Sequence, residues 1–217
     1  MSSSVVMGDQ LIARIPVDER GDALIDVRQH APELRWSTLY AEPTGAYSRL
    51  RTGVLQRLRK ARNALPPGYD LLLVEGYRPY DVQQRYYEDH CSELLERYGP
   101  LEPDTLRGLA SRHVSPPDVA PHVSGAAIDL VLSDAEGNAL DMGTRINATP
   151  DESDGACYLD APNITDFARG HRDILATAMA TAGFAAYPPE WWHWSYGDRY
   201  WAFTLEVQYA LYGPVHP

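Results

Sequence analysis

A histidine and an aspartate, both common metal ligands, stand seven residues apart in a run of small residues. His122 follows a loop that contains three prolines, and Asp129 lies in the small, β-compatible stretch 125–132. An odd spacing places two side chains on opposite faces of a continuous strand. Both residues therefore reach one ion only if His122 precedes the strand and the chain bends near Gly125. Taken alone, an ordinary loop histidine is the simpler explanation of His122.

A carboxylate and a second histidine occur together in the aromatic segment 190–194. Glu190 directly follows two prolines, and His193 stands between two tryptophans. A catalytic zinc uses three protein ligands and leaves one position open. His193 would complete that number, and Glu190 would remain as the general base that takes a proton from water. In isolation the segment is better explained as a hydrophobic strand with a satisfied polar histidine and a surface glutamate, but together with the first pair it predicts a catalytic metal site.

An arginine occupies the predicted corner between a buried strand and a helix, in the sequence Glu-Gly-Tyr-Arg-Pro at 75–79. The guanidinium of Arg78 is permanently charged, so beside a metal it can hydrogen-bond the oxyanion that develops when water attacks an amide carbonyl. A surface arginine paired with Glu75 or Asp81 explains the same residue, and both interpretations stay open.

The elements that must position these residues follow from hydrophobic periodicity and from glycine and proline signals. Helices are predicted over 46–65, 79–99, 103–112 and 165–182. Strands are predicted over 69–76, 125–132, 139–142, 184–187 and the aromatic stretch 190–204, with loops at 113–121 and 143–163. Residues 1–45 contain only weak strand signals and are expected to form a mobile lip. The pattern predicts one α+β domain over residues 1–217, with a central antiparallel sheet flanked by helices.

Composition narrows the function further. The chain has 217 residues and a formal net charge of −11, which argues against nucleic-acid and membrane-surface partners. It contains no apolar run long enough to span a membrane, and a cytoplasmic location is expected. Cys91 and Cys157 lie in no Cys-x-x-Cys pair, so both are expected to be free thiols. The oligomeric state stays open.

These residues together resemble the D-alanyl-D-alanine dipeptidases, including the vancomycin-resistance enzymes, over about residues 34–212. The motif Ser-x-His-x-x-Gly-x-Ala-x-Asp is matched from His122 to Asp129, Glu-x-Trp-His from Glu190 to His193, and Gly-Tyr-Arg-Pro from Gly76 to Pro79. The resemblance implies the fold shared by DD-carboxypeptidases and the Hedgehog N-terminal domain. It also implies one Zn²⁺ per chain held by His122, Asp129 and His193, with Glu190 as general base and acid, and Arg78 stabilising the tetrahedral intermediate.

The sequence departs from the family pattern at two positions near the expected substrate. Ala120 replaces the serine two residues before the first histidine, and Asn147 replaces the aspartate that family members often show in the long loop. Asn147 and Tyr77 are expected to contact a small dipeptide, which the lip and the loop would keep short. D-Ala-D-Ala is the expected substrate. The alternatives are another D-amino-acid dipeptide or specialised amide, and a zinc-binding scaffold without catalysis, against which the presence of Glu190 argues.

Overall fold

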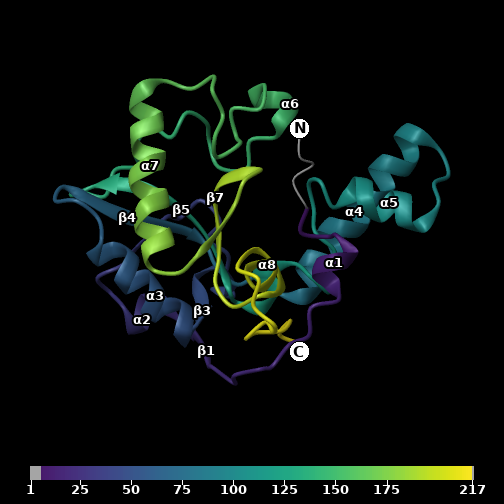
Figure 1. The fold of residues 1–217 in the computed structure, drawn as a ribbon, viewed down its shortest axis with the longest axis horizontal. Coiled ribbons are helices and arrows are strands. Elements are labelled where there is room, and N and C mark those ends of the chain that lie inside the picture. The colour runs from purple at the N-terminus through teal and green to yellow at the C-terminus, as the bar shows by residue number, and fades with distance from the viewer. Residues whose placement is uncertain (1–5, 217) are drawn as a thin grey trace.

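The computed structural model describes residues 6–216, which form a five-stranded sheet in the order β2-β4-β5-β7-β6 (Figure 1). β4, β5, β7 and β6 pair antiparallel, whereas the two-residue β2 runs parallel to β4. The predicted α+β class with an antiparallel central sheet is confirmed, and β2 adds a short parallel edge. The strands are β2 (Arg35–Trp36), β4 (Tyr69–Glu75), β5 (Ala127–Asp134), β6 (Ala185–Tyr187) and β7 (Glu190–Ser195).

Helices and a small second sheet surround this sheet. Three helices agree with the predictions for 79–99, 103–112 and 165–182, and the helix predicted over 46–65 begins only at Thr52. The helices are α1 (Gln10–Ala13), α2 (Val27–His30), α3 (Thr52–Asn63), α4 (Tyr80–Tyr98), α5 (Pro103–Ala110), α6 (Pro150–Ser153), α7 (Asp166–Thr181) and α8 (Arg199–Thr204). The 3-10 turns η1 (Ala46–Ser48) and η2 (Pro121–Ser124) complete the set, and β1 (Leu24–Asp26) pairs antiparallel with β3 (Arg49–Arg51).

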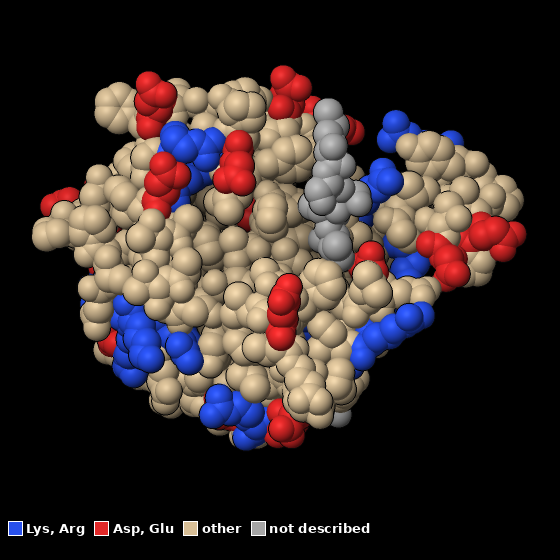
Figure 2. Space-filling model, viewed as in Figure 1, with Lys and Arg blue, Asp and Glu red and all other residues tan. Residues whose placement is uncertain are grey.

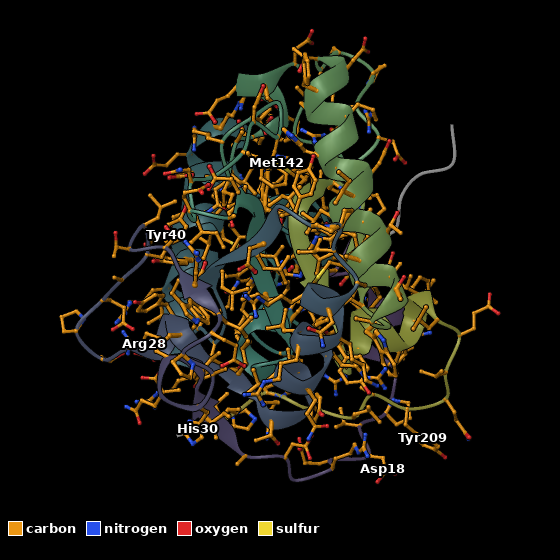
Figure 3. The ribbon with its side chains drawn as sticks, turned by 90° about the vertical axis from the view of Figure 1, so that its left-hand side faces the viewer. Asp18, Arg28, His30, Tyr40, Met142 and Tyr209 are labelled. Carbon is orange, nitrogen blue, oxygen red and sulfur yellow. The ribbon has the colours of Figure 1, made fainter. Side chains whose placement is uncertain are left out.

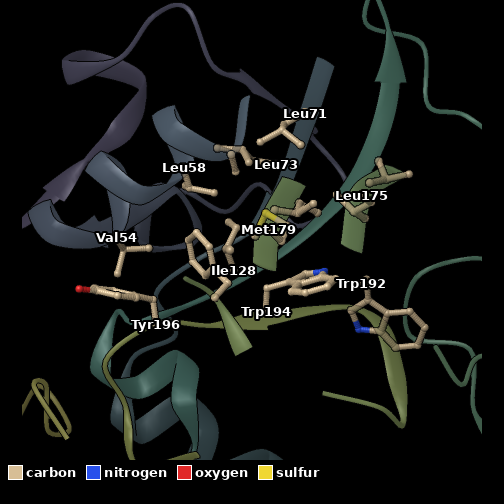
Figure 4. Packing of buried hydrophobic residues seen from close by; sticks show 14 of the residues in the cluster. Val54, Leu58, Leu71, Leu73, Ile128, Leu175, Met179, Trp192, Trp194 and Tyr196 are labelled. Carbon is tan, nitrogen blue, oxygen red and sulfur yellow. The ribbon is translucent and has the colours of Figure 1, made fainter. Parts of the chain in front are cut away.

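One face of the sheet packs against α3 and α7, and this contact forms the main core (Figures 1 and 4). Leu73 on β4 and Ile128 on β5 are fully buried there, against Leu58 of α3 and Met179 of α7. Burying one such side chain stabilises a fold by roughly 1.5–3 kcal/mol. Because side chains alternate along a strand, Asp129, the neighbour of Ile128, points to the opposite face. The helical layer therefore leaves that opposite face for polar groups.

Of the predicted strands, the one at 139–142 is absent from the described chain and the one at 190–204 is shorter than predicted. The segment 139–142 forms only one β-bridge, between Ala139 and Ser133. After the turn that follows β5, the chain pairs with β5 at this single position and then leaves the sheet. The aromatic stretch is a strand only as far as Ser195 and then becomes α8. Gly197 has a φ of +91°, which ends the strand, and the carboxylate of Asp198 accepts a hydrogen bond from the Trp201 backbone N–H and so caps the helix.

The described part of the N-terminal segment packs closely against the domain. Ile12 and Val27 are fully buried, and Val17 pairs with Ala210 near the other end of the chain. In Figure 3, Asp18 and Tyr209 accordingly lie close together at the lower right. The mobility predicted for residues 1–45 stays a prediction, and residues 1–5 lie outside the described residues.

The long loop predicted at 143–163 is anchored to α7 by a buried arginine. The Arg172 guanidinium donates from Nε to the Met142 carbonyl at 2.7 Å and from Nη2 to the Ala156 carbonyl at 2.7 Å. Burial lowers its pKa to about 10. These bonds fix both ends of the loop segment that contains Asn147, so that segment has a defined position relative to the sheet.

Three further expectations from the sequence concern the surface charges, membrane-spanning helices and the cysteines. Basic and acidic groups are interspersed on the face shown in Figure 2. Within residues 6–216, no helix combines the length and the apolar character that crossing a membrane would require. Cys91 and Cys157 are both free, as predicted.

Candidate metal centre and active site

Three separate elements bring two histidines and an aspartate together on the open face of the sheet. Asp129 on β5 is paired directly with His193 on β7, so the two side chains project from the same face. His122 comes from η2, which ends at Gly125 in a left-handed conformation, with φ +67°. The bend that the odd spacing required is therefore present, and it turns His122 toward the two strands.

The spacing of the three side chains fits one tetrahedral metal ion. His122 Nε2 lies 3.2 Å from His193 Nδ1, His193 Nδ1 lies 3.0 Å from Asp129 Oδ1, and Asp129 Oδ1 lies 3.4 Å from His122 Nε2. Tetrahedral zinc with bonds of about 2.0–2.1 Å separates neighbouring ligand atoms by about 3.3–3.4 Å. The ligand atoms would need to shift only by tenths of an ångström to meet this requirement. Among the described residues, these three side chains form the group of potential ligands that lie close enough together to hold an ion.

Burial and hydrogen bonds prepare this cluster before any ion binds. All three side chains are buried, with exposed fractions of 2–6%. Burial opposes the charge of Asp129, but His122 and His193 outweigh it and hold the pKa of that carboxyl below its ordinary value. Burial would likewise lower the pKa of His122, but the Asp129 carboxylate raises it. The carboxylate is thus kept ionised, which is the form that binds metal.

A backbone contact fixes the orientation of His122. Its Nδ1 lies 2.6 Å from the Gly76 carbonyl oxygen, so Nδ1–H donates there and Nε2 keeps its lone pair toward the cluster. Gly76 is required for this approach, because a Cβ at that position would lie 2.6 Å from the Arg49 carbonyl oxygen. The glycine of the Gly-Tyr-Arg-Pro corner therefore supports the orientation of His122 as well as the turn.

Glu190 lies at the start of β7, beside the cluster. A register shift in the β6–β7 pairing places it opposite Tyr187 and lets it line the same cavity as His193, although the two residues are three apart on one strand. Burial raises the pKa of Glu190 to about 7, and the nearby Asp129 carboxylate adds to that shift. A carboxyl with this pKa both accepts and releases a proton near neutral pH, as a general acid–base group must.

Arg78 pairs with Glu75, as one of the two interpretations expected, and it also lines the cavity, while its role toward an oxyanion stays a prediction. Its Nε and Nη2 donate to the two Glu75 carboxylate oxygens at 2.8 and 2.6 Å, and Nη1 donates to the Gln83 side-chain oxygen at 2.7 Å. Burial would lower the pKa of Arg78, but the Glu75 carboxylate outweighs it, so the guanidinium stays charged. These bonds use three of its five N–H donors. The same side chain lines the cavity, where its other donors are available to a ligand.

The cluster opens into a cavity of about 280 Å³. Asn147 belongs to its lining and donates a 2.6 Å hydrogen bond to the Tyr40 hydroxyl, whereas Tyr77 is not among the described lining residues. Gln83 and Tyr187 also line it, and nothing in their local sequence distinguishes them. Met7 and the segment 147–150 also belong to the lining.

The bend at Gly125 provides a stability test of the cluster's support. Gly125→Ala would force a side chain into a left-handed backbone and place its Cβ 2.4 Å from Leu24 Cδ1. We expect a loss of about 2–3 kcal/mol in the free energy of unfolding, and weaker metal binding because His122 shifts. Urea denaturation measures the first effect. Gly21→Ala is the matched control, since Gly21 has φ +72° with open space around it, and it should cost about 1–2 kcal/mol.

Two histidines, one carboxylate and an adjacent carboxyl with a near-neutral pKa, gathered in a cavity, define a candidate metal-dependent hydrolase site. Sequence comparison agrees with that class. The family described as D-Ala-D-Ala dipeptidase, within the M15 peptidases, matches residues 22–210, and the chain belongs to it.

Curated relatives extend the similarity over nearly the whole chain. A D-alanyl-D-alanine dipeptidase of Synechocystis is 31% identical, over 93% of this chain and 95% of its own length. An enzyme of the same name from Enterococcus faecalis is 28% identical, over 85% of this chain and 95% of its own. The match therefore extends over nearly the full length of both relatives.

A solved structure shares the fold. The LdcB LD-carboxypeptidase superposes with a TM-score of 0.51 at 18% sequence identity, over 88% of this chain and 76% of its own. At this identity the likeness concerns the arrangement of helices and strands alone. It supports the predicted fold class independently of the sequence matches.

Proposed function

We propose that this chain is a zinc dipeptidase that hydrolyses D-alanyl-D-alanine to two molecules of D-alanine. The observation that carries the proposal is the placement of Glu190, a carboxyl with a pKa of about 7, beside a buried His-Asp-His cluster whose spacing fits a tetrahedral ion. A purely structural zinc site has no use for an unliganded carboxyl at its side. The family match and the two full-length relatives support the choice of substrate.

In this proposal His122, Asp129 and His193 hold one zinc per chain. When bound, zinc supplies a Lewis acid that polarises the scissile carbonyl and lowers the pKa of water. Glu190 takes a proton from the attacking water as the new carbon–oxygen bond forms, and then delivers it to the leaving amine nitrogen as the carbon–nitrogen bond breaks. The second D-alanine leaves with a neutral amino group, which takes up a further proton from solvent.

Arg78 is proposed to stabilise the negative charge on the carbonyl oxygen during attack. Its guanidinium group is held in place by hydrogen bonds to Glu75 and Gln83. The Gln83 side chain is in turn fixed by a 2.7 Å hydrogen bond that its Nε2 donates to the Ser115 carbonyl. Donors fixed before the reaction stabilise developing charge without a cost of reorganisation. The guanidinium therefore acts from a position that the fold has already set.

The cavity supports a short substrate. Its volume of about 280 Å³ lies at the small end of ligand sites, and Met7 and the segment 147–150 bound it. A dipeptide fits such a space better than an extended chain. A cytoplasmic location, expected from the sequence, remains part of this proposal.

A second candidate substrate is a D-amino-acid dipeptide or amide whose amino group carries no charge. Among the described lining residues, the carboxylates are Asp129 and Glu190, both already assigned, whereas Arg112 brings an additional positive charge to the rim. An ammonium group therefore meets no carboxylate of its own in this lining. Asn147, which stands at the cavity, offers it only a neutral amide.

A dipeptide panel tests the proposal. We expect the purified, zinc-loaded protein to release alanine from D-Ala-D-Ala but not from L-Ala-L-Ala, and to act weakly on the D-alanine tripeptide. Faster cleavage of N-acetyl-D-Ala-D-Ala than of the free dipeptide would favour the second candidate. A protein that binds zinc and cleaves none of these amides would contradict the proposed function and favour a non-catalytic scaffold.

A further inference from the structure

The second nitrogen of His193 faces away from the cluster, toward a serine on the same strand. His193 Nδ1 faces Asp129, whereas its Nε2 lies 3.4 Å from the Ser195 hydroxyl oxygen. Ser195 follows two residues later on β7, so its side chain lies on the same face, and it is fully buried. A serine in this place is a direct neighbour of the ligand on the side opposite to the ion.

An aspartate with an unused oxygen lies beyond this serine. Asp198 is only 2% exposed, and its Oδ1 accepts a 2.9 Å hydrogen bond from the Trp201 backbone N–H at the start of α8. Its other oxygen, Oδ2, is buried and has no hydrogen-bond partner within residues 6–216. A helix cap needs one carboxylate oxygen, and a second oxygen left buried without a partner costs about 1–3 kcal/mol. Capping alone therefore does not explain this carboxyl.

The Ser195 hydroxyl, which contacts His193, lies within hydrogen-bonding reach of the Asp198 carboxyl. Burial raises the pKa of Asp198, while hydrogen bonds from the Trp201 backbone N–H and the Ser195 hydroxyl act in the opposite direction. The three side chains thus form a row that runs from the metal cluster to the start of α8.

We propose that Ser195 and Asp198 are positioning residues for His193: Nε2–H of the imidazole donates to the Ser195 hydroxyl oxygen, and the hydroxyl donates to Asp198 Oδ2. This inference rests on the proposed zinc site. The row keeps the proton on Nε2 and leaves the Nδ1 lone pair for zinc. His122 has the opposite arrangement, because its Nδ1–H donates to the Gly76 carbonyl. The two histidines would therefore bind one ion through different nitrogens, each fixed by its own outer partner.

Asp198→Asn separates this role from helix capping. Asparagine caps a helix about as well as aspartate, so the start of α8 is retained. It lacks the negative charge that holds the Ser195 hydroxyl as a donor. Ser195→Ala removes the hydroxyl itself and leaves Asp198 and its cap intact. Asp9→Asn is the matched control, since Asp9 caps α1 through a 2.8 Å bond from the Leu11 N–H and does not line the cavity.

Zinc affinity, measured by competition with a chromogenic chelator, is the main readout. We expect Asp198→Asn and Ser195→Ala each to bind zinc about 10–100-fold more weakly than the unmodified protein, with Asp9→Asn unchanged. Thermal unfolding of the zinc-free proteins should differ little between Asp198→Asn and Asp9→Asn. Imidazole ¹⁵N spectra of the zinc-free protein should show the His193 proton on Nε2, and a shift toward the other tautomer in Ser195→Ala.

The outcomes separate this inference from the proposed function. If the unmodified protein binds zinc and both site variants bind it within twofold of that value, the positioning role is wrong and the zinc site stands. If the unmodified protein does not bind zinc, the proposed function itself fails. Should Asp198→Asn not fold, the affinity and the spectra of Ser195→Ala decide.

Discussion

Glu190→Ala is expected to lower kcat for D-Ala-D-Ala by about 10²–10⁴ while the protein keeps its zinc. The variant retains the three proposed ligands, and it removes the one carboxyl of the cavity lining that the cluster does not use. The lost group would have accepted a proton from water and returned it to the amine, so both halves of the proton transfer slow down. Metal analysis and steady-state kinetics on the same preparation measure the two quantities.

Two further variants sharpen this test. Glu190→Gln keeps the size of the side chain and its hydrogen bonding but cannot accept a proton, so it should be as inactive as Glu190→Ala. Glu136→Ala removes an exposed glutamate in the turn after β5 and should leave kcat unchanged. Loss of zinc together with activity in both Glu190 variants would mean that Glu190 is a ligand, and the assignment of base and ligands would have to be exchanged.

The His-Asp-His cluster could be predicted from sequence because its residues come from two short segments, each with a recognisable pattern. Gly125 marks the bend that lets His122 and Asp129 meet, and the short motif at 190–194 supplies the partner residues. What joins the two ends is the direct pairing of Asp129 with His193 across neighbouring strands. That pairing is a long-range contact: the number of ligands that a catalytic zinc needs suggested that the two ends meet, but no local pattern specifies the strand pairing itself.

Other features depended on tertiary contacts that no local pattern contains. The aromatic stretch after Ser195 has strand propensity, but Gly197 and the Asp198 cap turn it into α8, because a glycine with positive φ and a capping carboxylate override side-chain preference. The same change from predicted strand to helix also hides the positioning role that we propose for Asp198. The predicted strand 190–204 gave Asp198 no role, and only its burial next to Ser195, a neighbour of His193, connects it to the His-Asp-His cluster.

The fold also shows why Arg78 could not be assigned by sequence alone. Pairing with Glu75 and contact with the cavity were alternatives when only the residue types were known. In the structure, Glu75 stands opposite Asp129 on neighbouring strands, so the arginine that pairs with it is brought to the cavity by the same register. The ion pair is the means by which the guanidinium reaches the site.

His122→Ala is expected to have the second large effect, the loss of zinc binding and of activity together. Removing one of three ligands should weaken zinc binding by more than the 10–100-fold that an outer partner costs. The zinc-free variant should also lose about 1–3 kcal/mol in unfolding free energy, because the Gly76 carbonyl and the buried Asp129 carboxylate each lose a partner.

Zinc-dependent thermal unfolding distinguishes lost binding from lost stability in His122→Ala. Zinc at 100 times its Kd stabilises the unmodified protein by about 2.7 kcal/mol, which for a domain of this size raises Tm by about 5–11 °C. The variant should show a lower Tm without zinc and almost no rise on adding it, whereas His30→Ala, which removes an exposed histidine, should behave like the unmodified protein. A full zinc-dependent rise in His122→Ala would show that the ion is held without this imidazole. Asp129 and His193 would then need a third ligand, and Glu190, the remaining carboxyl of the cavity lining, would be the first residue to examine.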